Sequence, residues 1–322
     1  MHNIMNNLEN KKTKISIYRH RQKVWLTSGL AVLMSIVGFI VSSLDSSIGL
    51  PVRPGLDFTG GTQIRLERDC SDQCNQIGSE VISEALNNIS ISQNESSQKF
   101  FGARVQFLDE YNSLSIRVPS LSASESKNLI QSLVNIAGPF KSGGQYIETI
   151  GPTLGAQLLK TTLISLFAAF SCVAFYISIR FDKKFSFLAI LALIHDVLIV
   201  CGIFSWLGIY LDVEVNSLFA VALLTIAGYS VNDTVVVFDR IRELNKQDNS
   251  LNPTQRIDLA VSATLTRTLY TSGTTLLPLC ALIFFGGSTL YWFAVALALG
   301  VIVGSWSSIA LVPSLLTLQK DE

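Results

Sequence analysis

The sequence predicts a polytopic α-helical membrane protein with six transmembrane helices and one extracytoplasmic α+β domain between the first two helices. Two observations lead to this fold class. Of the 322 residues, 49% are hydrophobic and only 15% are charged, and the apolar residues are concentrated in long runs. One long hydrophilic segment interrupts these runs, between the first and the second. A soluble chain would distribute its apolar residues more evenly.

Six segments are long and apolar enough to cross a membrane, which takes about 20 residues of helix. They are residues 24–44, 158–179, 185–207, 215–238, 259–285 and 291–318. The chain therefore divides into a basic leader (1–23), the first helix (24–44), the outer domain (45–157), a membrane bundle of five helices (158–318) and a short tail (319–322).

Basic residues orient these spans, because cytoplasmic loops carry an excess of Lys and Arg. The leader carries six of them just before the first span: Lys11, Lys12, Lys14, Arg19, Arg21 and Lys23. Alternation then places residues 180–184, residues 240–256 and the tail on the same side. We expect both termini to be cytoplasmic. The first span is expected to be a retained anchor, because its apolar stretch is longer than that of a signal peptide and no A-x-A cleavage site follows.

The outer segment 45–157 shows the pattern of a small mixed domain. Residues 62–67, 101–108, 113–118 and 145–150 have strand character, residues 75–86 have helical spacing, and residues 109–112 form a turn. Ser122 and Glu125 have the spacing of a capping box, which predicts that a second helix begins there. The resulting order βαββαβ is the split βαβ or ferredoxin-like arrangement. The polar stretch 87–99 is predicted to be a loop.

Cys70 and Cys74 lie in this outer domain, where oxidation is possible. No histidine or second cysteine pair accompanies them, so structural or unpaired thiols are favoured over a metal site, and a strained local disulfide is the other alternative. No metal or organic cofactor is expected. The zero net charge gives no indication of a nucleic-acid partner.

Three ionisable residues lie inside apolar spans: Asp196, Asp233 and Arg267. A charge in hydrocarbon is costly and usually marks an ion or substrate pathway. Asp233 lies six residues before Asp239, and Arg267 nine residues after Asp258, where charged residues resume at the cytoplasmic ends of two consecutive spans. At 1.5 Å per residue the two depths are roughly 9 and 13 Å, so the side chains could meet.

Two interpretations of this pair stand side by side. It is either a titrating site or a buried ion pair that fixes the register of two helices. Asp196 and its neighbour His195, near the middle of the third span, are further candidates for a proton pathway, as is Asn232. The alternative for His195 is an interior histidine whose hydrogen bonds Asp196 satisfies. Numerous hydroxyl groups on the fourth and fifth spans could bond between helices or hold water.

Several motifs resemble those of the SecF family. They are PGLDFTGG at 54–61, IGPTLG at 150–155, HDV at 195–197, GYSVNDTVVVFDRIRE at 228–243, TLTRTLYTS at 264–272, GG at 286–287 and GSWSS at 304–308. They occur in the family's order and with its membrane topology. Two positions depart from the family pattern: Ser262 replaces an asparagine in NxTLxRT, and Trp306 replaces the tyrosine of GTYSS. Neither departure removes a charged position.

The resemblance implies a subunit of the SecDF complex, in the resistance-nodulation-division superfamily, in the cytoplasmic (inner) membrane or, in a photosynthetic source, the thylakoid membrane. The implied partners are a SecD-like subunit with six spans, the SecYEG channel, the SecA ATPase, preproteins and membrane lipid. The implied function is to use the proton gradient to assist preprotein translocation. Asp233 and Arg267 fall on the family motifs linked to proton transport.

Further motif residues receive structural or accessory roles from this resemblance. They are Asp57, Phe58, Gly60 and Gly61 after the first span, and Gly228, Asp239 and Arg240 in the fourth. Asp57 is interpreted first as a residue of a tight turn, and second as part of the joint between the first span and the outer domain.

Two other function classes remain open at this level. A proton-coupled small-molecule exporter of the same superfamily would also carry intramembrane charges, and a membrane scaffold would need no titrating aspartate. An enzyme is not expected, because the sequence has no Ser-His-Asp order, metal-ligand cluster, Walker loop or dinucleotide fingerprint.

Overall fold

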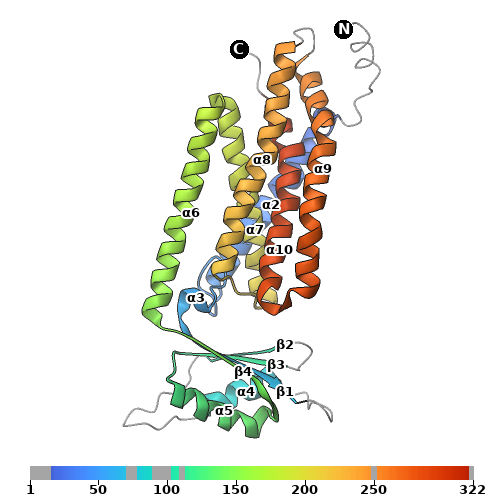
Figure 1. The fold of residues 1–322 in the computed structure, drawn as a ribbon. Coiled ribbons are helices and arrows are strands. Elements are labelled where there is room, and N and C mark those ends of the chain that lie inside the picture. Colours follow the sequence, from blue (N-terminus) through green and yellow to red (C-terminus); the bar gives the residue numbers. More distant parts are fainter. Residues whose placement is uncertain (1–15, 70–77, 89–102, 109–112, 248–251, 319–322) are drawn as a thin grey trace. The chain divides into compact units, whose positions relative to one another are not determined.

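The computed structural model describes residues 16–69, 78–88, 103–108, 113–247 and 252–318, which form two units (Figure 1). The helical unit comprises Met1–Arg53 and Thr162–Glu322, and the sheet unit comprises Pro54–Thr161. The boundary between them falls inside one long helix, α6 (Pro152–Arg180). Each unit has its own hydrophobic core.

The described residues contain six helices that are long and apolar enough to span a membrane, as the hydropathy pattern predicts. They are α2 (Ile17–Leu44), α6, α7 (Lys183–Tyr210), α8 (Ser217–Gln247), α9 (Pro253–Phe285) and a last span that begins with α10 (Gly287–Trp306). Most of them extend beyond the predicted apolar segments, because helical hydrogen bonding continues into polar residues outside the apolar stretch. The last helix continues through a π-helical turn, η1 (Ser307–Leu311), into α11 (Val312–Leu316).

Helices α7 and α8 carry many of the buried side chains of the helical unit, including Phe204 and Phe238. Helix α10 packs against α8 and α9, and α2 packs against α7 (Figure 1). Small residues make these approaches close. A Cβ atom added at Gly202 would lie 2.2 Å from the Cβ of Ser35, and one added at Gly300 would lie 2.2 Å from the side chain of Ile226. Such small-residue contacts are a common basis of helix association in membranes.

The sheet unit has the element order predicted from the sequence. Its strands are β1 (Gly61–Arg68), β2 (Arg104–Leu108), β3 (Ser113–Val118) and β4 (Phe140–Ile150), with helices α4 (Ser79–Asn88) and α5 (Ala123–Ala137). The four strands form one antiparallel sheet in the order β2-β3-β1-β4. Inward residues of β1 and β3, such as Ile64 and Ile116, are fully buried with α4 and α5 residues such as Leu86 and Leu133.

Helix α5 begins as predicted. The Ser122 hydroxyl accepts the backbone N–H of Glu125, and the Glu125 carboxylate accepts the backbone N–H of Ser122, so the capping box is complete. Strand β4 starts at Phe140, earlier than the predicted residue 145. Phe140 pairs with Arg68 of β1, beyond a bulge between the two strands. The alternation of polar and apolar residues in the sequence does not reveal this extension of β4. Cys70, Cys74, the predicted turn at 109–112 and most of the predicted loop at 87–99 lie outside the described residues.

The motif that follows α2 forms a short helix, α3 (Leu56–Thr59), and then a tight turn into β1. Gly60 and Gly61 both have positive φ, at 68° and 122°. A Cβ atom added at Gly60 would lie 2.9 Å from the Cα of Pro152. One added at Gly61 would lie 2.8 Å from the carbonyl oxygen of Val118. The two glycines are therefore required by backbone conformation and by close packing.

Candidate functional site

Asp233 lies on the buried side of α8, in the part of the helix that packs inside the bundle. Its exposed fraction is 3%, and the neighbouring hydroxyl residues Ser230 and Thr234 are equally buried. Among the described residues, no hydrogen-bond donor reaches the buried Oδ2 atom of Asp233, and Thr234 Oγ1 is also unpartnered. A buried polar atom without a partner costs free energy, so this carboxylate is a site where a proton or a water molecule would be stabilising.

Arg267 lies on α9 beside α8, but its side chain is exposed on the outside of this chain. It is near enough to attract the Asp233 carboxylate electrostatically. However, within the described residues no hydrogen bond or ion pair joins the two side chains. The structure thus places the predicted pair on adjacent helices without direct contact, and the interpretation as a register-fixing ion pair does not hold in this conformation.

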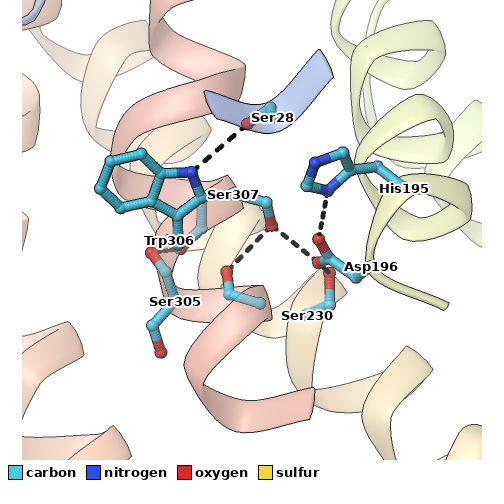
Figure 2. A network of polar contacts seen from close by, with 9 residues as sticks. Ser28, His195, Asp196, Ser230, Ser305, Trp306 and Ser307 are labelled. Atoms are coloured by element: carbon cyan, nitrogen blue, oxygen red, sulfur yellow. Dashed lines mark hydrogen bonds and ion pairs between the residues drawn. The ribbon is translucent and has the colours of Figure 1, made fainter. Parts of the chain in front are cut away.

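Asp196 is the centre of a compact polar network (Figure 2). Its side chain is fully buried, and it accepts three hydrogen bonds from three different elements. Its Oδ1 atom lies 2.8 Å from Nδ1 of His195 on α7, and its Oδ2 atom accepts the hydroxyls of Ser230 on α8 (2.6 Å) and Ser307 in η1 (2.7 Å). Asp196 therefore joins three helical elements at one point, whereas the sequence indicated only its neighbour His195 as a partner.

One polar atom of this network is left without a partner in the described part of the chain. A Cβ atom added at Gly304 would lie at ordinary contact distance, 3.4 Å from Ser230 and 3.6 Å from Oδ2 of Asp196. The other ring nitrogen of His195, Nε2, is buried without a hydrogen-bond partner among the described residues. The predicted interpretation of His195 as a fully satisfied interior histidine is therefore incomplete in this structure.

A second chain of hydroxyl groups connects α8, α9 and α10. Tyr229 donates to Ser272 at 3.0 Å, and Ser272 and Ser305 lie 2.6 Å apart. The indole N–H of Trp306 donates to Ser28 on α2 at 3.3 Å, as Figure 2 shows. The tyrosine-to-tryptophan departure at position 306 therefore places an indole donor against the first spanning helix.

The remaining motif residues occupy less buried positions. Asn232 and Gly228 are exposed on α8. Asp239 forms an ion pair with Arg180 at 3.2 Å, and Arg240 pairs with Glu243 at 2.6 Å. Asp57 lies in the first turn of the short helix α3, before the tight turn at Gly60 and Gly61, and Phe58 follows it.

Sequence reasoning missed Ser230 and Ser307 as partners of Asp196. Both lie in motifs that were singled out, at 228–243 and 304–308, so motif membership was the available signal. Within the described residues no group of His, Cys, Asp and Glu side chains could hold a metal ion.

Comparison with known proteins gives two family matches. Residues 132–322 match the family described as protein export membrane protein SecD/SecF, C-terminal, and residues 46–72 match the SecD/SecF GG motif. The chain is 70% identical over 312 residues to protein translocase subunit SecF of Prochlorococcus marinus, covering 97% of each chain. It is 36% identical over 305 residues to the SecF of Synechocystis sp., covering 94% of this chain and 93% of that one.

Two solved structures support these family matches. The crystal structure of SecDF from Thermus thermophilus matches with a TM-score of 0.76 at 30% identity over 94% of this chain. A crystal structure of SecDF in a super-membrane-facing form matches with a TM-score of 0.60 at 28% identity. In both comparisons the chain spans 38% of the SecDF chain.

Proposed function

Because this chain belongs to the SecF family of protein-export membrane proteins, we propose that it uses a proton gradient to assist preprotein translocation, with Asp233 as its proton-binding carboxylate. As a SecF it is an integral membrane protein and an accessory subunit of Sec protein export, rather than a classical enzyme. The proton is the coupling ion, and no other cofactor is proposed.

The observation that carries the proposal is the unpartnered Oδ2 atom of Asp233 inside an apolar helix bundle. A proton bound there removes a charge that the surrounding apolar residues do not stabilise. It also removes the attraction toward Arg267 on α9, and so alters the relative free energies of two arrangements of α8 and α9. Each proton that crosses the membrane supplies about 2.3 kcal/mol per 100 mV, which is enough to shift a two-state equilibrium by roughly fiftyfold.

An exposed polar face supports a partner with its own spanning helices. The outward stripe of α8 carries Thr225, Gly228 and Asn232, and the neighbouring outward face of α9 carries Arg267 and Thr274. Lipid is a poor environment for these groups, so we propose that a SecD subunit covers them. The solved SecDF chains, of which this chain spans 38%, support the presence of such a subunit. Asn232 then faces the partner, next to the proton pathway.

The wider assignments are proposals of the same kind. We propose SecYEG, SecA, preproteins and membrane lipid as further partners, with the cytoplasmic or thylakoid membrane as the location. Cytoplasmic placement of both termini is supported by the basic residues at 11–23 and by the basic ends of α6 and α8. The divisions 1–23, 24–44, 45–157, 158–318 and 319–322 are kept as functional regions.

We also propose that the sheet unit is a ferredoxin-like domain. Support comes from the order β1-α4-β2-β3-α5-β4 and from the strand order β2-β3-β1-β4, in which each strand-helix-strand connection passes over one intervening antiparallel strand.

The test is gradient-dependent export in membrane vesicles that contain the full chain together with SecD, SecYEG and SecA. We expect Asp233→Asn to reduce export to the level that an uncoupler produces in the wild type, while the variant remains folded and abundant. Asp239→Asn is the matched control: it removes the same charge from the same helix, but its partner Arg180 is at a partly exposed helix end. Full gradient dependence in Asp233→Asn would refute the proposal.

A further inference from the structure

The hydroxyl group of Ser307 has two acceptors and one hydrogen. Its Oγ atom lies 2.7 Å from Oδ2 of Asp196 and 3.0 Å from the backbone carbonyl of Gly304. A serine hydroxyl donates one hydrogen bond, so it can serve only one of these acceptors at a time. Ser230 donates to the same carboxylate oxygen at 2.6 Å, and in the described part of the chain its hydroxyl has no second acceptor. Ser307 is thus the one donor of this carboxylate placed to alternate.

The position of Ser307 in the last helix gives this choice a structural consequence. It is the first residue of the π-helical turn η1, and its backbone N–H is shared between the carbonyls of Gly304 and Val303. The i→i+5 pattern begins at this residue, because the backbone N–H of Val312 bonds to the carbonyl of Ser307. Single π-helical turns inside α-helices are frequent at functional sites. When the Ser307 hydroxyl changes its acceptor, the change occurs at the residue where the backbone hydrogen-bond pattern switches from α to π.

We infer that Asp196 is a second proton-binding site and that Ser307 is a two-position hydroxyl switch that transmits its charge state to the π-helical turn of the last span. When Asp196 is ionised, the Ser307 hydroxyl donates to Oδ2, because a hydrogen bond to a charged acceptor is about twice as strong as one to a neutral carbonyl. When a proton binds to Oδ2, the new O–H group donates to Ser307 Oγ, and the Ser307 hydrogen turns to the carbonyl of Gly304. One proton is gained and no covalent bond of the chain is broken.

Two neighbouring groups bear on this titration. His195 of α7 is the only other titratable side chain that contacts Asp196 among the described residues. The contacts from α8 and η1 come from the neutral residues Ser230 and Ser307. Asp233 lies one helical turn beyond Ser230 on α8 and, among the described residues, makes no hydrogen bond to Asp196. The inference deepens the proposed function and rests on it for the source of the proton, but its hydrogen-bond switch is measurable separately.

Trp306 provides a native reporter, since it directly precedes Ser307 and its indole N–H donates to Ser28. The experiment is fluorine NMR on the full chain with its SecD partner in lipid nanodiscs, with fluorotryptophan at the four tryptophan positions. The Trp306→Phe variant assigns the Trp306 signal. We expect this signal to change with pH as Asp196 gains its proton.

Four variants separate the switch from other origins of the titration. Asp196→Asn and Ser307→Ala are each expected to abolish it, while infrared difference spectra of Ser307→Ala retain the protonated carboxyl band of Asp196. Ser308→Ala is the matched control, because this buried hydroxyl lies in the same turn and donates to the Ser305 carbonyl instead. The Trp306 signal of the Ser308→Ala variant should titrate as it does in the wild type. His195→Gln should shift the midpoint and keep the titration.

The outcome for Asp233→Asn distinguishes this inference from the proposed function. We expect that variant to lose gradient-dependent export and to keep the Trp306 titration. Three results would overturn the inference: a wild-type Trp306 signal that does not titrate, a titration that persists in Asp196→Asn, or equal behaviour of Ser307→Ala and Ser308→Ala.

Discussion

Replacing Gly202 by alanine is predicted to weaken the contact between α2 and α7. The added Cβ atom would lie 2.2, 2.3 and 2.5 Å from the Cβ, Oγ and Cα atoms of Ser35. Ordinary contacts between such atoms are about 3.5–4.0 Å, so the two helices would have to separate by roughly 1 Å or more. Rotation of the Ser35 side chain does not relieve the overlap, because its backbone Cα atom is among the contacts.

The expected magnitude follows from the cost of overpacking, about 1–3 kcal/mol in a well-packed core. Gly273→Ala on α9 is the matched control, because a Cβ atom there meets nothing within 4 Å. Both substitutions change a helical glycine to alanine, so both gain the same intrinsic helix propensity of up to about 1 kcal/mol. The difference between the two variants therefore isolates the packing term.

The assay is reversible unfolding of the full chain in mixed micelles, with helicity followed as the denaturing detergent is increased. Ser35→Gly in the Gly202→Ala background should restore part of the lost free energy of unfolding, because it removes two of the three close contacts and leaves the Cα atom at 2.5 Å. Equal unfolding free energies for Gly202→Ala and Gly273→Ala would refute the close-approach argument, as would complete rescue by Ser35→Gly.

Three further predictions concern the sheet unit and the end of the bundle. Ser122→Ala should cost about 1 kcal/mol of helix stability by removing the N-cap of α5, measured as faster amide hydrogen exchange in its first turn. Arg53→Met and Asp212→Asn should each destabilise the helical unit, with a coupling energy of about 0.5–3 kcal/mol in a double-mutant cycle, because the buried Arg53 pairs with Asp212 at 2.5 Å. Gly60→Ala should lower the amount of folded full chain in membranes, whereas Gly49→Ala, with similar φ but open space around it, should lower it less.

Much of the fold could be predicted because each element has a strong local signal. A spanning helix requires a long apolar run, so composition alone locates all six. The capping box at Ser122 determines where α5 begins. The start of β4 at Phe140 was missed, because strand pairing across a bulge depends on β1 and leaves little trace in the alternation of β4 itself.

For the candidate site, residue counting predicts position along a helix but not direction around it. At 1.5 Å per residue it predicts similar depths for Asp233 and Arg267, on two helices that the structure shows packed together. Successive residues on a helix differ by 100°, however, and Thr268 is buried whereas Arg267, one position earlier, is exposed. Two residues at similar depths on adjacent helices can therefore be in contact, or one of them can point away because it is rotated by 100° around its helix axis.

The same geometry supports different proposed roles for Asp196 and Asp233. Asp196 is held by donors from α7, α8 and η1, so its charge is stabilised within this chain and its protonation alters contacts among the chain's own helices. Among the described residues Asp233 has an unpartnered oxygen, and Arg267 on the adjacent helix faces outward. Its charge is therefore left to be stabilised by water or by a partner that covers α8 and α9, and the free energy of its protonation depends on that partner. A carboxylate of the first kind suits a sensor of internal packing, whereas one of the second kind suits coupling between two subunits.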